Sequence, residues 1–272
     1  MKQTISDIAE ELIKMNAPII NSYHLGLRNG LMGISLFFFY CARLTEDERY
    51  EKIAEYNFEK VITGAHYYMN YFFASEFADI GRTTYLLNKE KFIKANPDEL
   101  AKYFDEPLIK RIKKDLGLDF GFCTGITGIC DYFLNKGNNE EVLDITFKQI
   151  YSALRVKGYP MNPVNPLTLF PPEVLRDVKL FFLKSEKSGV YIPDKKRLYK
   201  AIQKIESKNR IQNTSPEYTI MQDLREAVIL EDNQIIQSSL EILAKNSSNL
   251  IFKGLSMLSL KDDSVSAWCS LA

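Results

Sequence analysis

The side chains of this 272-residue sequence that could bind zinc through sulfur or imidazole nitrogen are four cysteines and two histidines. They are Cys41, Cys123, Cys130, Cys269, His24 and His66. No Cys-x-x-Cys pair is present, so a three-ligand centre would have to combine Cys123 and Cys130 with a distant histidine, an arrangement that the spacing does not favour. We therefore expect no metal and no other cofactor. Cys41, Cys123 and Cys130 are interpreted as small buried apolar side chains.

Three residues are candidates for acid or base chemistry. His24 comes just before an apolar stretch, where it could titrate in a pocket or serve as a loop residue bonded to backbone. Asp79 and Arg82 interrupt an apolar segment at a predicted helix start. They form either a buried pair that lines a cavity or a solvated pair at its mouth. Catalytic residues are otherwise unknown from the sequence.

A basic segment between Lys179 and Arg210 holds ten basic and three acidic residues. Five of its cations fall on one predicted helix: Lys195, Lys196, Arg197, Lys200 and Lys204. Such a run is either a solvated outer face or a docking surface for an acidic peptide or partner protein. Nucleic acid is not expected, because aromatic residues do not interleave with the cations and 35 basic residues balance 35 acidic ones.

The composition, 46% hydrophobic and 26% charged, is that of a globular protein and excludes disordered, collagen-like and disulfide-scaffold classes. The N-terminal residues carry acids where a signal peptide requires an apolar core. The longest uncharged apolar stretch useful to a membrane is Gly30 to Ala42, well short of the roughly 20 residues of a spanning helix. We expect a cytoplasmic protein that does not bind membranes.

Helical periodicity dominates the chain, and apolar helices alternate with amphipathic ones. Gly30–Ala42 and Gly128–Leu134 are apolar on all sides, whereas Asp47–Val61 and Glu140–Val156 carry a charged stripe. This alternation predicts helical hairpins with one enclosed and one solvated member. Helix starts are predicted by a Thr45–Glu48 capping box and by turn residues near Pro97, Pro172, Pro216 and Leu250.

A repeated motif gives the spacing of the hairpins. Asn29-Gly30-Leu31-Met32-Gly33-Ile34 recurs 95 residues later as Thr124-Gly125-Ile126-Thr127-Gly128-Ile129, with a degenerate copy at 78–81. Two repeats of roughly 47 residues explain this shift, so about six hairpins are expected. Paired glycines indicate close approach of enclosed helices. The sequence therefore predicts an all-α fold, a single α/α toroid domain over residues 1–272.

The Gly-x-x-Gly-Ile entry, followed by a polar helix that begins Thr-x-Asp-Glu-x-Tyr, resembles the lanthionine synthetase C-like (LanC-like) family. Leu27–Ile62 carries the best match and Asp119–Gly137 the second. Ile80–Asp115 resembles the second hairpin of the shorter bacterial members, and Gly254–Trp268 resembles their closing helix and tryptophan tail. The resemblance implies an α/α toroid that matures ribosomally made peptides. In the cyclases of this family, zinc held by two cysteines and a histidine activates a peptide thiol for addition to a dehydrated serine or threonine.

The chain departs from this family at its zinc motifs. Neither Gly-Trp-Cys-Tyr-Gly nor Cys-His-Gly is present, and the nearest string is Cys123-Thr124-Gly125. The later apolar helices, Pro172–Lys184 and Pro216–Ile229, contain no cysteine or histidine. The resemblance thus implies a zinc-free, non-cyclising member that binds a precursor peptide or a partner modification enzyme.

In such a toroid the N-termini of the enclosed helices meet on one rim, where unpaired N–H groups favour an anionic ligand. The expected pocket rim consists of Asn29, Asp79, Cys123 and Thr124. Two alternatives remain. One is an active peptide-modifying or glycan-acting enzyme, whose paired carboxylates would come from Asp79, Asp131, Glu173, Asp177 or Asp223. The other is a pure protein-interaction scaffold.

Overall fold

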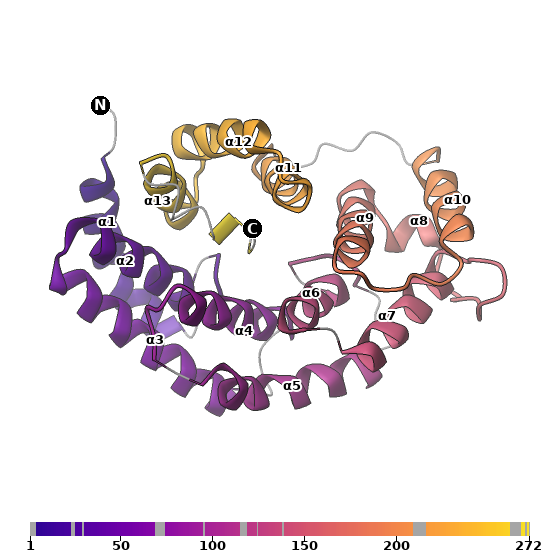
Figure 1. Ribbon diagram of the computed structural model, residues 1–272, viewed down its shortest axis with the longest axis horizontal. Helices are drawn as coiled ribbons and strands as arrows, with labels where there is room; N and C mark the ends of the chain where they lie inside the picture. The colour runs from indigo at the N-terminus through magenta and orange to yellow at the C-terminus, as the bar shows by residue number, and fades with distance from the viewer. Residues whose placement is uncertain are drawn as a thin grey trace. The chain divides into compact units, whose positions relative to one another are not determined.

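The computed structural model describes residues 4–22, 25–28, 30–68, 74–94, 96–114, 119–123, 125–137, 139–208, 216–261, 268–269 and 271. Within these residues the chain forms thirteen helices and no strand, which confirms the all-α prediction (Figure 1). The helices are α1 (Ile5–Ser22), α2 (Leu31–Thr45), α3 (Glu48–Tyr68), α4 (Ala74–Lys89), α5 (Pro97–Lys114), α6 (Ile126–Lys136), α7 (Glu140–Ala153), α8 (Pro166–Leu169), α9 (Pro172–Lys187), α10 (Lys195–Glu206), α11 (Pro216–Leu230), α12 (Asn233–Asn246) and α13 (Leu250–Ser259).

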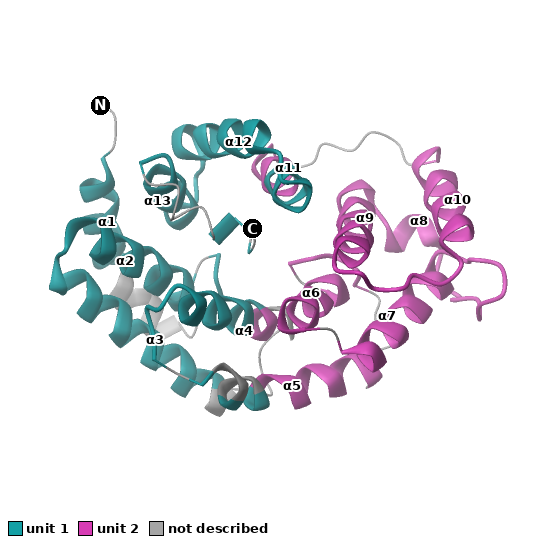
Figure 2. Ribbon diagram, viewed as in Figure 1, with its two compact units in different colours: residues 1–72, 79–103, 223–272 teal, residues 73–78, 104–222 magenta. Residues whose placement is uncertain are grey.

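The helices divide into two compact units (Figure 2). Unit 1 comprises residues 1–72, 79–103 and 223–272, and unit 2 comprises residues 73–78 and 104–222. The divisions fall inside α4, α5 and α11. The single domain over residues 1–272 stays a prediction.

In unit 1 the enclosed helix is α2, which is buried without interruption from Leu31 to Cys41. Its partner α3 buries one side, including Ala54 and Val61, and exposes charged residues on the other. Ser35 Oγ donates a hydrogen bond to the Ala54 carbonyl at 2.7 Å and so joins the two helices. The apolar and amphipathic patterns therefore predicted correctly which of the two helices is enclosed.

The last helix of the chain packs against the first two. A Cβ atom added to Gly254 on α13 would lie 2.5 Å from the Phe37 ring of α2 and 3.2 Å from Ile8 of α1. Asn249, the N-cap of α13, donates through its side chain to the Arg28 carbonyl at 2.6 Å. The fully buried Trp268 donates to Ser259 Oγ at 2.8 Å. The two ends of the chain thus share one core.

In unit 2 an aromatic cluster joins α7 to α9. The ring of Phe147 lies 5.7 Å from that of Phe181 and 5.4 Å from that of Phe182, in the range for stabilising aromatic pairs. Helix α6 packs on both α7 and α9 and is buried from Ile126 to Leu134. Helix α10 packs on α9 with Leu198, Ile202 and Ile205, its buried stripe.

The two copies of the glycine motif adopt the same local structure. Gly30 and Gly125 are extended N-caps, with φ −128° and −127°, so neither lies inside a helix. A Cβ atom added to Gly33 would lie 1.9 Å from the Leu27 carbonyl oxygen, and one added to Gly128 would lie 1.9 Å from that of Phe122. The second glycine is therefore required mainly by the loop that folds back over its own helix. Helix–helix approach contributes at Gly33, 3.0 Å from Ile251.

Several helix starts agree with the sequence, because α5, α9, α11 and α13 begin at Pro97, Pro172, Pro216 and Leu250. The capping box is wrong. Thr45 ends α2, where its hydroxyl donates to the Cys41 carbonyl at 2.8 Å. Asp47 takes the expected place of Thr45, since its carboxylate accepts from the Arg49 N–H in the first turn of α3. Thr45 belongs to the last turn of α2, so it cannot be the N-cap of α3.

None of the helices in the described part of the chain is long and apolar enough to cross a membrane.

Candidate functional site

Three of the predicted site residues, His24, Asn29 and Thr124, lie outside the described residues. Of the remaining rim residues, Asp79 belongs to unit 1 and Cys123 to unit 2, so each is described within its own unit. His66 belongs to α3, but its side chain lies outside the description. The rim as a whole stays a prediction.

Asp79 and Arg82 do not open a helix. Helix α4 begins at Ala74, which places both residues inside it, and the expectation that they stand at a helix start is wrong. The guanidinium of Arg82, almost fully buried, donates to the carboxylate of Asp79 one turn earlier. A buried charge left without its partner is strongly destabilising, so the fold requires Asp79 beside Arg82.

Two further candidate carboxylates are also bonded to other side chains in unit 2. Asp177 on α9 is fully buried and accepts from the Tyr218 hydroxyl at 2.5 Å and from Gln222 Nε2 at 2.9 Å. Its carboxylate also accepts from the backbone N–H of Phe122 at 2.9 Å, which ties α9 to the loop before α6. Asp131 on α6 accepts from Lys184 Nζ at 2.6 Å.

The cysteines do not fit the zinc centre of the cyclases in that family. Cys41, Cys130 and Cys269 are buried, and burial raises the pKa of each thiol to about 12. Zinc binds thiolate, which such surroundings disfavour. Cys130 Sγ lies 2.8 Å from Thr146 Oγ1, whose own hydroxyl donates to a carbonyl, so the cysteine remains the donor.

Cys123 is half-buried in the turn before α6, contrary to the expectation that it is buried. Within the described ranges no group of three or more His, Cys, Asp and Glu side chains could hold a metal ion.

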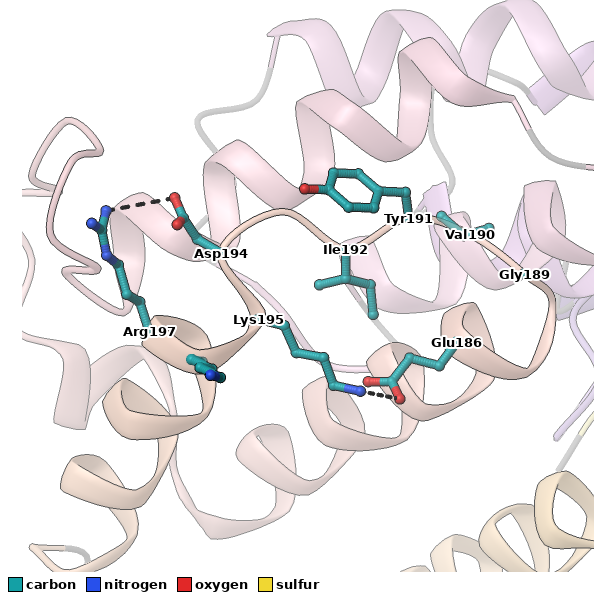
Figure 3. A pocket seen from close by; sticks show the side chains of 9 residues that line it. Glu186, Gly189, Val190, Tyr191, Ile192, Asp194, Lys195 and Arg197 are labelled. Carbon is teal, nitrogen blue, oxygen red and sulfur yellow. Dashed lines mark hydrogen bonds and ion pairs between the residues drawn. The ribbon is translucent and has the colours of Figure 1, made fainter.

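The strongest candidate surface is helix α10, which carries all five cations that the sequence indicated as a partner-binding run. Two of these cations have acidic neighbours. Lys195 Nζ lies 2.6 Å from the Glu186 carboxylate, and Arg197 lies 3.7 Å from Asp194 (Figure 3). The other three, Lys196, Lys200 and Lys204, are exposed and make no ion pair with any residue that the structure describes.

The start of α10 is poorly arranged for a helix. Asp194, its N-cap, is in the left-handed region, with φ 48° and ψ 32°, and its side chain caps no backbone N–H. Lys195, Lys196 and Arg197 then place three positive charges in the first turn, next to the positive end of the helix dipole. The helix forms because its apolar stripe is buried against α9, not because its local sequence favours this start.

A pocket of about 720 Å³ adjoins this helix start (Figure 3). It is lined by the last turn of α9, by the loop from Gly189 to Asp194 and by the first turn of α10. Tyr191 in this loop is 82% exposed, an unusual position for a large aromatic side chain.

No family model, curated protein or solved structure matches the chain. We therefore infer the role of the candidate site from its own residues. The negative charge of Glu186 is offset by Lys195, 2.6 Å away, and its carboxylate also accepts from the Tyr199 hydroxyl at 2.9 Å. Desolvation, together with this bond to Glu186, raises the pKa of Tyr199 to about 12 and keeps it a donor.

A second pocket, of about 930 Å³, lies between α7 and the loop over residues 158–164. Its lining is largely apolar and includes Ile145, Met161 and Val164. An apolar side chain could bind there, but the residues that line this pocket include no cluster of charged side chains.

Sequence reasoning found the cations of α10 but missed the pocket beside them. The available signal was Tyr191, an aromatic residue between Gly189 and Pro193 immediately before the basic run. Loops that position such a residue beside cations are common at binding surfaces.

Proposed function

We propose that this chain is a zinc-free, non-cyclising LanC-like protein that binds a precursor peptide or a partner modification enzyme in a lanthipeptide-type pathway. Its hairpins are proposed to close into an α/α toroid. The observation that carries the proposal is the duplicated helix entry, in which a Cβ atom added to Gly33 or to Gly128 would lie 1.9 Å from a carbonyl oxygen of the preceding loop. A 95-residue repeat that is also a structural repeat supports an array of equivalent hairpins.

Closure of the array is supported by the packing of α13 on α1 and α2. In an open solenoid each repeat contacts only its neighbours, so the first and last helices would lie apart. Here Gly254 instead meets Phe37, and Asn249 bonds to the loop at Arg28.

The absence of cyclase activity is proposed from the chemistry of the thiols. Activation of a substrate thiol requires a zinc ion with an open coordination position. The sequence lacks both family zinc motifs, and Cys41 and Cys130 sit in apolar surroundings that keep them protonated. Peptide binding is supported by Lys196, Lys200 and Lys204 of α10, which make no ion pair with any of the described residues.

A glycan-acting or peptide-modifying enzyme has less support. A general acid or base must reach its substrate, but Asp79, Asp131 and Asp177 are each bonded to a basic or donor side chain of the same unit. These bonds serve the packing of α4, α6 and α9.

Two measurements on the purified full chain test the proposal. The first is metal analysis after exposure to zinc, for which we expect far less than one zinc ion per chain. The second is affinity capture from the native cytosol with mass spectrometry, for which we expect a short peptide that carries cysteine and serine or threonine. Stoichiometric zinc bound by thiolates would overturn the non-cyclase assignment. Recovery of large proteins other than a modification enzyme would overturn the peptide pathway.

A further inference from the structure

We propose that the lysine face of α10, formed by Lys196, Lys200 and Lys204 with the Tyr191 pocket at its N-terminal end, is a docking site for an acidic segment of a peptide. This inference identifies the peptide-binding surface of the proposed function. It depends on that function only for the assumption that the partner is a peptide. Its starting point is that these lysines lack anionic neighbours in the described structure, whereas the flanking cations Lys195 and Arg197 have them.

The three lysines share one side of the helix. They are spaced four residues apart, and residues at this spacing lie above one another on a helix surface. All three are exposed, while the opposite side of α10 is buried through Leu198 and Ile202. The lysine face is therefore a row of positive charges open to solvent.

This row has an energetic cost. Like charges four residues apart destabilise a helix by about 0.2–0.5 kcal/mol per pair, and cations near the helix N-terminus add to that cost. Among the described side chains, no ion pair with a carboxylate offsets the cost at Lys196, Lys200 or Lys204. An anionic partner would relieve the repulsion, so the charge pattern is complementary to an acidic ligand.

The spacing of the charges suits a peptide. With a rise of about 1.5 Å per residue, neighbouring lysines on α10 are about 6 Å apart along the axis. In an extended peptide, every second residue points the same way and advances about 6.6 Å. A segment with carboxylates at alternate positions can therefore place one beside each of the three lysines.

The pocket determines the orientation in which the acidic segment binds along α10. It lies at the N-terminal end of α10, where Val190, Tyr191 and Ile192 supply apolar surface. Both carboxylates that line it have cationic neighbours, Glu186 bonded to Lys195 and Asp194 lying 3.7 Å from Arg197, and so repel an acidic ligand less. An apolar residue at one end of the acidic segment would fill the pocket against the exposed Tyr191 ring.

Nucleic acid fits this surface less well. Its phosphates present a dense charge that is bound by many cations together. The lysine face has three cations over about 12 Å of helix, within a chain of zero formal charge.

The test is fluorescence anisotropy with the full chain and a short labelled peptide in which glutamate alternates with alanine and ends on leucine. The variant Lys196→Glu/Lys200→Glu/Lys204→Glu reverses the face. Its matched control, Lys89→Glu/Lys110→Glu/Lys245→Glu, makes the same charge change on exposed lysines of α4, α5 and α12. We expect the first variant to bind about tenfold more weakly or worse, and the control to stay within about twofold of wild type.

Two further arms make the result specific. The same peptide with glutamine in place of glutamate should lose binding to wild type, and Tyr191→Ala should weaken binding of the acidic peptide while leaving its salt dependence intact. Equal weakening in the two triple variants would overturn the docking site. So would tighter binding of a single-stranded oligonucleotide or of anionic lipid vesicles that depends on the same lysines.

The outcomes separate the two proposals. If binding of the acidic peptide depends on the lysine face but capture yields no cysteine-bearing peptide, the docking site stands and the lanthipeptide assignment fails. If such a peptide is captured equally well by the Lys196→Glu/Lys200→Glu/Lys204→Glu variant, the function stands and the docking site fails.

Discussion

Two helix starts of unit 2 are built in opposite ways. At α6 the preceding loop folds over the helix, and the lack of a side chain at Gly128 leaves room for the Phe122 carbonyl. The backbone N–H of Phe122 donates a hydrogen bond to the buried Asp177. At α10 the helix follows a left-handed Asp194, lacks a side-chain cap and begins with three cations. The first start satisfies its polar groups within the fold. The second leaves charge unbalanced at the surface, which is where natural proteins depart from local rules for function.

The largest expected difference between the two helices is in thiol reactivity. In a Lys200→Cys variant the new thiol stands on the exposed face between two lysines, which favour its thiolate. The thiol of Cys130 on α6 has its pKa raised to about 12 by burial, so it carries little thiolate at pH 8. We expect alkylation at position 200 to be at least about a hundredfold faster than at Cys130, as measured by site-resolved mass spectrometry. Comparable rates would contradict the closed structure of α6.

Substitution of the motif glycines should have the largest effect on stability. In Gly33→Ala or Gly128→Ala the new methyl group would overlap a backbone carbonyl, which cannot move without displacing the loop. We expect a loss of about 3 kcal/mol in the free energy of unfolding, measured by urea denaturation.

The matched control for this prediction is Gly64→Ala on α3. The nearest atoms to its added Cβ belong to the flexible side chain of Leu25, at 3.0 Å and beyond. Helix propensity favours alanine there, so the net change should be within about 1 kcal/mol. A larger loss in Gly64→Ala than in Gly33→Ala would refute the role of the loop carbonyl.

The Asp177→Asn variant tests the bond network behind the α6 start. An amide in this position keeps one acceptor oxygen but presents an N–H₂ group to donors such as Tyr218 and Gln222. We expect a loss of about 2 kcal/mol in unfolding free energy. Asp144→Asn, which breaks only an exposed pair with Lys148, should cost about 0.5 kcal/mol or less. Equal effects of the two changes would show that Asp177 contributes no more than a surface carboxylate.

The smallest expected effect is on the stability of α10. Lys196→Glu removes a like-charge pair with Lys200 and places an acid near the helix N-terminus. Unfolding free energy should rise by about 0.5 kcal/mol, seen as a slightly higher Tm. A clear loss of stability would mean that the lysine serves the fold rather than a partner.

The fold was predictable from sequence where one local signal dominated. Proline at the first helical position set the starts of α9 and α11, and uninterrupted apolar sequence identified α2 as enclosed. The Thr45 cap and the helix start at Asp79 were wrong because both residues lie inside a helix, Thr45 in the last turn of α2 and Asp79 in α4. Thr45 bonds back to Cys41, and α4 extends N-terminally to Ala74.

The candidate site was only half predictable. Helical periodicity placed the five cations of the basic segment on one helix, which the structure has as α10. The pocket depends on the conformation of the loop between Gly189 and Asp194, which periodicity does not determine. The geometry around Gly33 was missed for a related reason, since contact with the Leu27 carbonyl follows from the path of the loop.

Hydrogen exchange with mass spectrometry, with and without the acidic peptide, tests the contrast between the two helix starts most directly. The account predicts that the peptide adds protection over residues 189–206 and leaves the already slow amides of α6 unchanged. Protection that appears at 119–134 instead, or no added protection on α10 at saturating peptide, would contradict it.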